Sequence, residues 1–127
     1  LSSGLETKLI NSILSSVPDF GKELPENWTE TLTQALFRAF VQNQKAVNIL
    51  FSGSRQGVFA NSIEQGLRKR IAEQDPTFAN DLRRGIVLSF CVQGGFYAFT
   101  NNSGRMDESK LVALLAEVAQ AAQRSGL

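Results

Sequence analysis

Hydrophobic residues recur at intervals of three and four along most of the chain, a pattern that predicts a series of amphipathic helices. The first run covers residues 5–17, and Pro18 ends it because proline disfavours helical backbone in the residue before it. A second run follows the loop of residues 19–26. There Asn27 is the predicted N-cap, and Glu30 stands three residues later, as in a capping box.

The middle of the chain predicts two more helices. A polar break at residues 42–44 precedes a short apolar helix over residues 46–51, which a Ser-Gly-Ser sequence ends. A long helix over residues 55–73 follows, with Ser54 as its predicted N-cap. Its apolar positions step by four along one face: Phe59, Ile63, Leu67 and Ile71.

A final helix is predicted to begin after Asp107 as its N-cap. Its apolar residues follow the a, d and e positions of a heptad and become smaller toward the C-terminus. They are Leu111, Leu114, Leu115, Val118, Ala121 and Ala122. Either an ordinary core-facing stripe or a seam between paired helices would give this pattern.

Residues 85–100 contain no charge in a chain of which 20% is charged, so we expect them to be buried. The stretch is shorter than the roughly 20 residues needed to cross a bilayer. Two strands around Gln93, Gly94 and Gly95 would form a hairpin. A helix that starts at Asp75 and Pro76 and stops at residues 101–104 is favoured, because residues 80–84 continue the helical spacing into the apolar run.

Wound as a helix, this stretch has two unlike faces. Large apolar groups and three hydrogen-bonding side chains share one face, which could line a cavity: Leu82, Ile86, Ser89, Phe90, Gln93 and Tyr97. Small residues share the other, which could pack closely against another helix: Val87, Cys91, Gly94, Gly95 and Ala98. A small chain has few elements to cover both faces, so we expect self-association.

Composition excludes several kinds of chemistry. The 127 residues predict one domain, and the net charge of +1 gives no reason to expect nucleic acid or a membrane as a direct partner. The chain has no histidine and one cysteine, which excludes a Ser-His-Asp triad, a histidine-bound metal and an internal disulfide. We therefore expect no enzyme, no metal and no cofactor. No signal peptide or membrane span is visible, and a reducing, cytoplasmic compartment fits.

Two motifs have a simpler reading than the functional one. The sequence Ser-Gly-Ser-Arg-Gln-Gly over residues 52–57 lacks the Gly-Lys-Ser/Thr end of a phosphate-binding loop, so a turn between helices accounts for it better. Arg68, Lys69 and Arg70 are basic, but Glu64, Glu73 and other acidic residues lie close by, which favours a solvated helix face.

The combined pattern resembles the C-terminal ligand-binding and dimerisation domain of TetR-family bacterial transcriptional regulators. The resemblance covers roughly residues 32–122. Its carriers are residues 40–44 followed by residues 47–51, the long helix of residues 55–73, and residues 90–96 leading to residues 107–111. Many members of that family carry a tryptophan near the end of the penultimate helix, where this chain has Phe99, Thr100 and Asn101.

The resemblance implies an all-α antiparallel bundle of about five to six helices, the last two forming a four-helix-bundle interface in a homodimer. It implies that a small, largely apolar effector sits among the earlier helices, and that DNA is bound only through an N-terminal helix-turn-helix domain. Since the chain opens on Leu1 and its only methionine is Met106, we expect that domain to have preceded it. The effector would shift the spacing of two DNA-binding domains by binding one arrangement better.

Seven residues are the candidate ligand-binding set, with Gln93 and Tyr97 as orienting polar groups among apolar walls. The set is Phe37, Phe40, Phe59, Ile63, Phe90, Gln93 and Tyr97. The candidate dimer interface is Gly94, Gly95, Ala98, Phe99, Leu111, Leu114, Leu115 and Val118. Two alternatives stay open from the sequence: the seven residues form a dry core, or the chain is a helical protein–protein interaction module without a small-molecule ligand.

Overall fold

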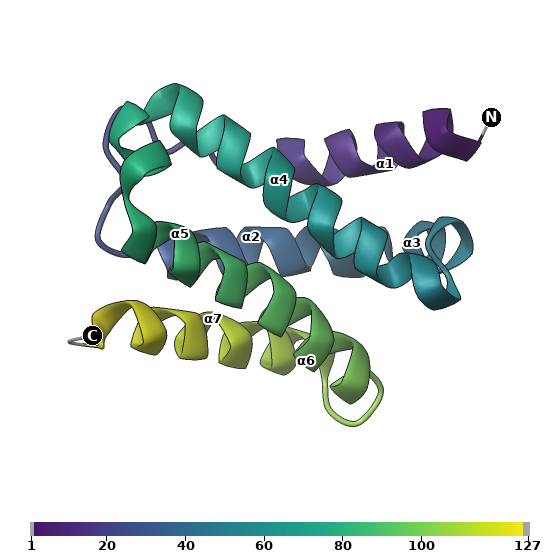
Figure 1. Cartoon of the computed structure of the whole chain (residues 1–127). Helices are drawn as coiled ribbons and strands as arrows, with labels where there is room; N and C mark the ends of the chain where they lie inside the picture. The colour runs from purple at the N-terminus through teal and green to yellow at the C-terminus, as the bar shows by residue number, and fades with distance from the viewer. Residues whose placement is uncertain (1, 126–127) are drawn as a thin grey trace.

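The structure, a computed structural model, describes residues 2–125 and is all-α over that range (Figure 1). The α-helices are α1 (Ser2–Ser15), α2 (Trp28–Gln42), α3 (Gln44–Leu50), α4 (Gln56–Gln74), α5 (Leu82–Ser89), α6 (Gly95–Asn102) and α7 (Glu108–Arg124). Three shorter turns are η1 (Gly53–Arg55), η2 (Pro76–Asn80) and η3 (Phe90–Gly94). The predicted all-α fold is confirmed, and the helix boundaries lie within a few residues of the predicted ones, except for the helix of the chargeless stretch.

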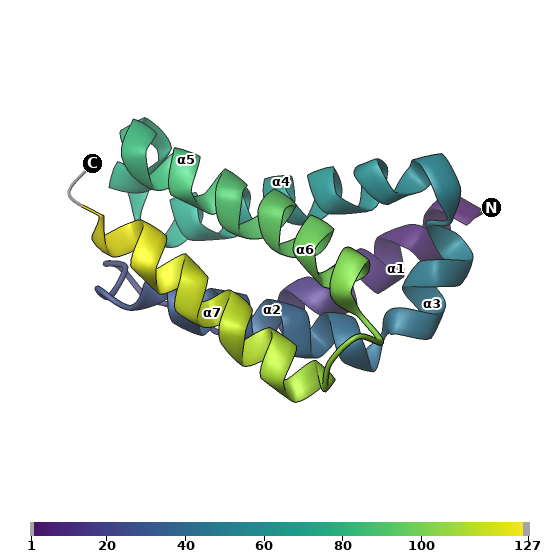
Figure 2. The same cartoon turned by 90° about the horizontal axis from the view of Figure 1, so that it is seen from below.

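The helices pack in both antiparallel and parallel pairs. Thr29 at the start of α2 bonds Gln120 near the end of α7, so these two helices run in opposite directions. In contrast, α1 runs alongside α4 in the same direction (Figure 1), with its C-terminal end held by Arg70. Figure 2 shows α5, α6 and α7 together on one side of the molecule, with α4 and α2 behind them.

The chargeless stretch is helical, not a hairpin, and its helix begins later than the sequence indicates. Asp75 caps the short turn η2, and Pro76 occupies its first position, as expected. The chain then leaves helical geometry at Asp81, whose carboxylate accepts a hydrogen bond from the backbone N–H of Arg84 and caps α5. The continuous helical spacing of residues 80–84 therefore gives no sign of the second N-cap at Asp81.

From Leu82 to Asn102 the chain forms one continuous rod, interrupted by a wider turn. Residues Phe90–Gly94 form the π-helical turn η3 between α5 and α6. A π-turn accommodates one more residue per turn than regular α-helix, so it shifts the angular positions of the residues that follow it. Spacing at 100° per residue does not anticipate this shift.

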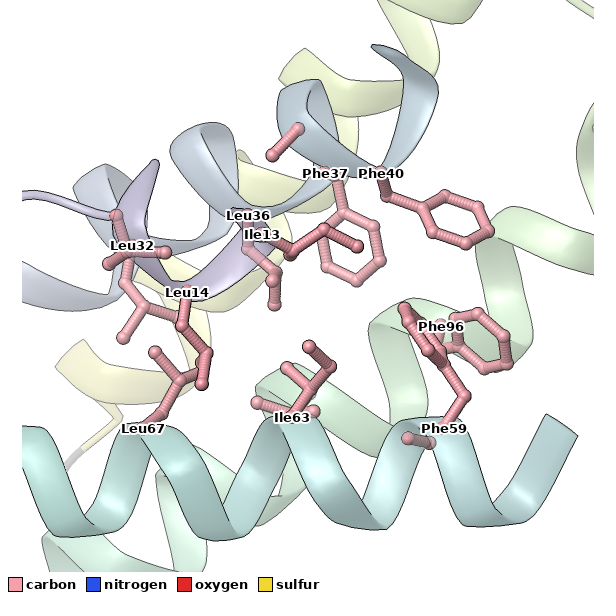
Figure 3. Close-up of a cluster of buried hydrophobic side chains, with 14 of the residues drawn as sticks. Ile13, Leu14, Leu32, Leu36, Phe37, Phe40, Phe59, Ile63, Leu67 and Phe96 are labelled. Carbon is pink, nitrogen blue, oxygen red and sulfur yellow. The ribbon is translucent and has the colours of Figure 1, made fainter. Parts of the chain in front are cut away.

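Phenylalanine rings from α2, α4 and α6 form the centre of the core (Figure 3). Phe40 packs edge-on against Phe96 and Phe99, with ring centroids 5.2 and 5.0 Å apart. Phe59 of α4 lies 5.2 Å from Phe96. Edge-on packing places the positive edge of one ring on the negative face of another, which favours a fixed arrangement. This cluster anchors the α5–α6 rod to α2 and α4.

Some of the predicted helix N-caps are confirmed and others are wrong. Asp107 caps α7, accepting a hydrogen bond from the backbone N–H of Lys110 at 3.2 Å. Asn27 stands at the N-cap of α2 but makes no side-chain capping bond, so the predicted capping box does not form. Ser54 lies within η1, and Arg55 occupies the N-cap of α4.

Candidate interaction site on the last two helices

Four of the seven predicted ligand-binding residues are packed into the core. Phe37, Phe40, Phe59 and Ile63 are each at most 3% exposed. They surround a void of about 10 Å³, which is room for about one water molecule. Figure 3 shows their side chains pointing toward one another with Phe96. In this conformation they form a dry core instead of a ligand cavity.

The other three lie elsewhere, so the seven residues do not line a common cavity. Phe90 and Tyr97 are on the surface, 72% and 67% exposed. Gln93 donates hydrogen bonds to Asn61 and Glu64 of α4, at 3.0 and 2.9 Å. Any role of these residues in effector binding stays a prediction.

The bulky face of the α5–α6 rod points outward, contrary to expectation. Leu88, Val92, Phe96 and Phe99, a third set of positions, face the core. Large residues and small residues define the two predicted faces of the rod, but a helix that is apolar all round offers a further side to bury. The phenylalanines at 96 and 99 fill that side, where they complete the aromatic cluster.

This orientation leaves large apolar side chains on the surface of the last two helical elements. They are, with their exposed fractions, Leu82 (81%), Ile86 (58%), Phe90 (72%) and Tyr97 (67%) of the α5–α6 rod, and Leu114 (46%) and Val118 (60%) of α7. We call these six residues the apolar face. Between Gly85 and Gly104 the rod contributes no charge to it.

A groove of about 240 Å³ runs beside Phe90, between α6 and α7. Its lining is mostly small and apolar: Thr33, Phe90, Cys91, Gly94, Gly95, Ala98, Leu115, Val118, Ala119 and Ala122. The groove exists because glycines and alanines stand where larger side chains would fill the space between the helices. Gly94 is open to it: a Cβ atom there would meet nothing within 4 Å.

The predicted dimer-interface residues divide into two groups. Gly94, Leu114 and Val118 are exposed, and Ala98 and Leu115 are half-buried, all on the side of the molecule that carries the apolar face. The predicted members Phe99 and Leu111 are instead 0% and 3% exposed, inside the core of the single chain. Gly95 faces inward against the Phe37 ring as well as lining the groove.

Cys91 on the groove wall is poorly suited to catalysis. Burial raises the pKa of its thiol to about 11, although the neighbouring Thr33 hydroxyl acts in the opposite direction. The Thr33 hydroxyl is buried without a hydrogen-bond partner of good geometry. A thiol with a raised pKa is almost entirely protonated at neutral pH and is a weak nucleophile. The residues that line the groove around it include no aspartate, glutamate, lysine or histidine that could act as a base.

A polar network joins the rod to α4 on the side away from the groove. The Glu64 carboxylate, 8% exposed, accepts hydrogen bonds from Ser89 at 2.7 Å, from Gln93 and from Arg68. Burial works against ionisation of Glu64, but these three hydrogen bonds outweigh it and lower the pKa of the carboxyl. Sequence reasoning missed this network. Its signal was the placement of Ser89 and Gln93, four residues apart in an apolar run.

A cleft of about 200 Å³ lies between the α1–α2 loop and the C-terminal half of α4. The guanidinium of Arg70 reaches into this region, but it already donates to the backbone carbonyls of Leu14 and Val17. These bonds satisfy free carbonyl groups at the end of α1. Arg70 therefore has a structural role there.

Within residues 2–125 no cluster of three or more acidic, cysteine or histidine side chains could hold a metal ion. In the same part of the chain no helix is long and apolar enough to span a membrane. No family model matches the chain, and no curated protein or solved structure is similar enough to count as a match.

Proposed function

We propose that this chain is a homodimerisation domain, in which the α5–α6 rod and α7 pair with the same helices of a second copy in a four-helix bundle. The observation that carries the proposal is the apolar face, which leaves Phe90, Tyr97 and four aliphatic side chains in water. Isolated apolar residues are common on protein surfaces, but six on two adjacent helices are not.

The size of the apolar face fits an interface. At the exposed fractions above, six large side chains present on the order of 600 Å², given about 150–250 Å² for an aromatic side chain. Apolar patches beyond a few hundred Å² mark interaction sites on soluble proteins. A standard interface takes about 800 Å² from each partner. The apolar face together with the groove approaches that area.

A second copy suits this face because of its helical arrangement. The rod and α7 run antiparallel: Arg83 at the start of the rod donates hydrogen bonds to the carbonyls of Gln123 and Ser125 at the end of α7. Two antiparallel pairs related by a twofold axis form a four-helix bundle, whose shared core would bury both apolar faces. The resemblance to TetR-family regulators supports the same pairing.

In a regulator of that family the dimer would set the spacing of two DNA-binding domains. An effector would act by favouring one spacing over another. Because the void among the core phenylalanines is about 10 Å³, an effector could enter there only if the aromatic cluster opened. The proposal therefore depends on dimerisation and not on an effector.

Sedimentation equilibrium of the 127-residue chain tests the proposal. We expect twice the 13.9 kDa chain mass at micromolar concentration. Phe90→Glu should give a monomer, because it buries a charge in the interface. Ile49→Glu is the matched control: Ile49 is also 72% exposed but lies on α3, off the apolar face. It should remain dimeric.

Two results would contradict the proposal. One is a wild-type chain that sediments as a monomer at all concentrations, which would favour the alternative that the apolar face binds a different protein. The other is a dimer that Phe90→Glu leaves intact while Ile49→Glu disrupts it, which would place the interface near α3.

A further inference from the structure

Phe90 protrudes from the middle of the apolar face, directly beside the groove between α6 and α7. Phe90 is 72% exposed and forms part of the rim of the groove between α6 and α7. The groove is open beside the ring. The surface thus presents a knob and a hole next to each other. Resting on the dimerisation proposed above, we infer that the Phe90 ring of each copy enters the groove of the other copy.

The groove has the size and chemistry to receive a phenyl ring. An apolar cavity of about 150 Å³ holds benzene in another protein, and this groove measures about 240 Å³. Its accessible surface is almost entirely apolar, and no charged side chain contributes to the lining. A ring that moved from water into this space would leave no polar group newly unpaired.

Symmetry makes the contact reciprocal. In a twofold interface, if a residue of one copy contacts a given position of the other, the reverse contact also forms. Phe90 is on the rim of its own groove. A twofold axis close to Phe90 therefore places the ring of each copy at the groove of the other copy. The small residues Gly94 and Ala98 allow the two rods to approach closely at this crossing. Tyr97 and Val118 would then lie around the inserted rings.

A size-exchange cycle between Phe90 and Ala98 tests the inference, with the dimer dissociation constant measured by sedimentation. Phe90→Ala should weaken the dimer on the order of 100-fold or more, because two rings per dimer lose their burial. Ala98→Leu should weaken it at least about 10-fold, because the added side chain occupies the groove. In the double variant the leucine fills the space that the ring vacated, so affinity should recover well above the product of the two single effects.

Ala113→Leu is the matched control, since Ala113 is an exposed alanine of α7 that does not line the groove. It should dimerise like the wild type. Thermal unfolding of each variant at low concentration separates a change of association from a change of fold.

The outcomes distinguish this inference from the proposed function. A wild-type dimer that tolerates Ala98→Leu, or a double variant whose loss equals the product of the two single losses, would overturn ring insertion and leave dimerisation standing. A monomeric wild type would overturn both.

Discussion

Phe37 occupies the space that a side chain on Gly95 would need. A Cβ atom at Gly95 would lie 2.7 Å from two ring atoms of Phe37, which is itself 1% exposed and stacked against Phe99. The ring is rigid and enclosed, so it has no room to withdraw. The lack of a side chain at Gly95 thus lets the rod approach α2. It matters more for packing of the core than for the dimer face.

Gly95→Ala should therefore destabilise the single chain. Overpacking a core typically costs about 1–3 kcal/mol, and this exceeds the gain of up to about 1 kcal/mol from replacing glycine by alanine in a helix. Gly94→Ala is the adjacent control, since a Cβ there meets nothing within 4 Å in the single chain. At concentrations that keep the chain monomeric, it should be neutral or stabilising. Urea unfolding of both variants measures the difference. Equal stability of the two would contradict the close contact with Phe37.

The Glu64 network predicts a dependence of stability on pH. Because the pKa of Glu64 is lowered from 4.5 in the folded state, its contribution is present above pH 4.5 and is lost as the pH falls through the lowered value. Glu64→Gln should remove part of this dependence and cost about 1–3 kcal/mol at pH 7, since the partners on the rod lose a charged acceptor.

Glu73→Gln, an exposed position on the same helix, is the control for the Glu64 substitution. Some acid sensitivity should persist in Glu64→Gln. The pKa values of Asp75 and Asp81 are also lowered, by hydrogen bonds from Thr77 and Arg84 respectively. Unfolding free energies measured between pH 3 and 7 would show this remaining acid sensitivity. A Glu64→Gln profile parallel to that of the wild type would exclude the Glu64 network as a source of the pH dependence.

Cys91 should resist modification while the chain is folded. Its thiol is 6% exposed and its pKa is raised to about 11, so the thiolate fraction at pH 8 is on the order of one in a thousand. Alkylation with iodoacetamide, followed by mass spectrometry, should be slow until denaturant is added. Fast alkylation of the native chain would show that the groove is wider in solution or that the thiol is activated.

Two predicted N-caps differ in a way that mutation can measure. The Asp107 side chain bonds the backbone of α7, so Asp107→Ala should cost about 1 kcal/mol. The Asn27 side chain makes no capping bond, so Asn27→Ala should change stability by only a few tenths of a kcal/mol. Thermal unfolding of the two variants compares them, and a larger loss for Asn27→Ala would reverse the assignment.

The sequence predicted the helices better than their orientation. Spacing of three and four located α1, α4 and α7, because each buries one stripe and exposes the rest. The same signal is ambiguous for the α5–α6 rod, where apolar residues lie on every side. Its inward side depends on Phe96 and Phe99 meeting Phe40 of α2, a contact between segments more than 50 residues apart. No local pattern encodes such a contact.

The candidate site was predicted in part for the same reason. Gly94, Ala98, Leu114 and Val118 lie on the outer side of the last two helices, where the small-residue and heptad patterns suggested a seam. The prediction that Phe90 and Tyr97 line an internal cavity rests on the helix face that they share with hydrogen-bonding side chains. Their exposure becomes visible only when the core-facing positions of the rod are known, and the extra residue in η3 shifts those positions further.

The pairing of α2 with α7 has a consequence for how the chain is made. Thr29 and Gln120 are 91 residues apart, so a ribosome that adds about 5–20 residues per second delivers the final helix roughly 5–20 seconds after the second. During that interval the aromatic rod has emerged without the neighbour that closes its flank. A nascent chain in this state would depend on chaperones, or on an adjacent nascent chain, to keep its exposed apolar segments from aggregating.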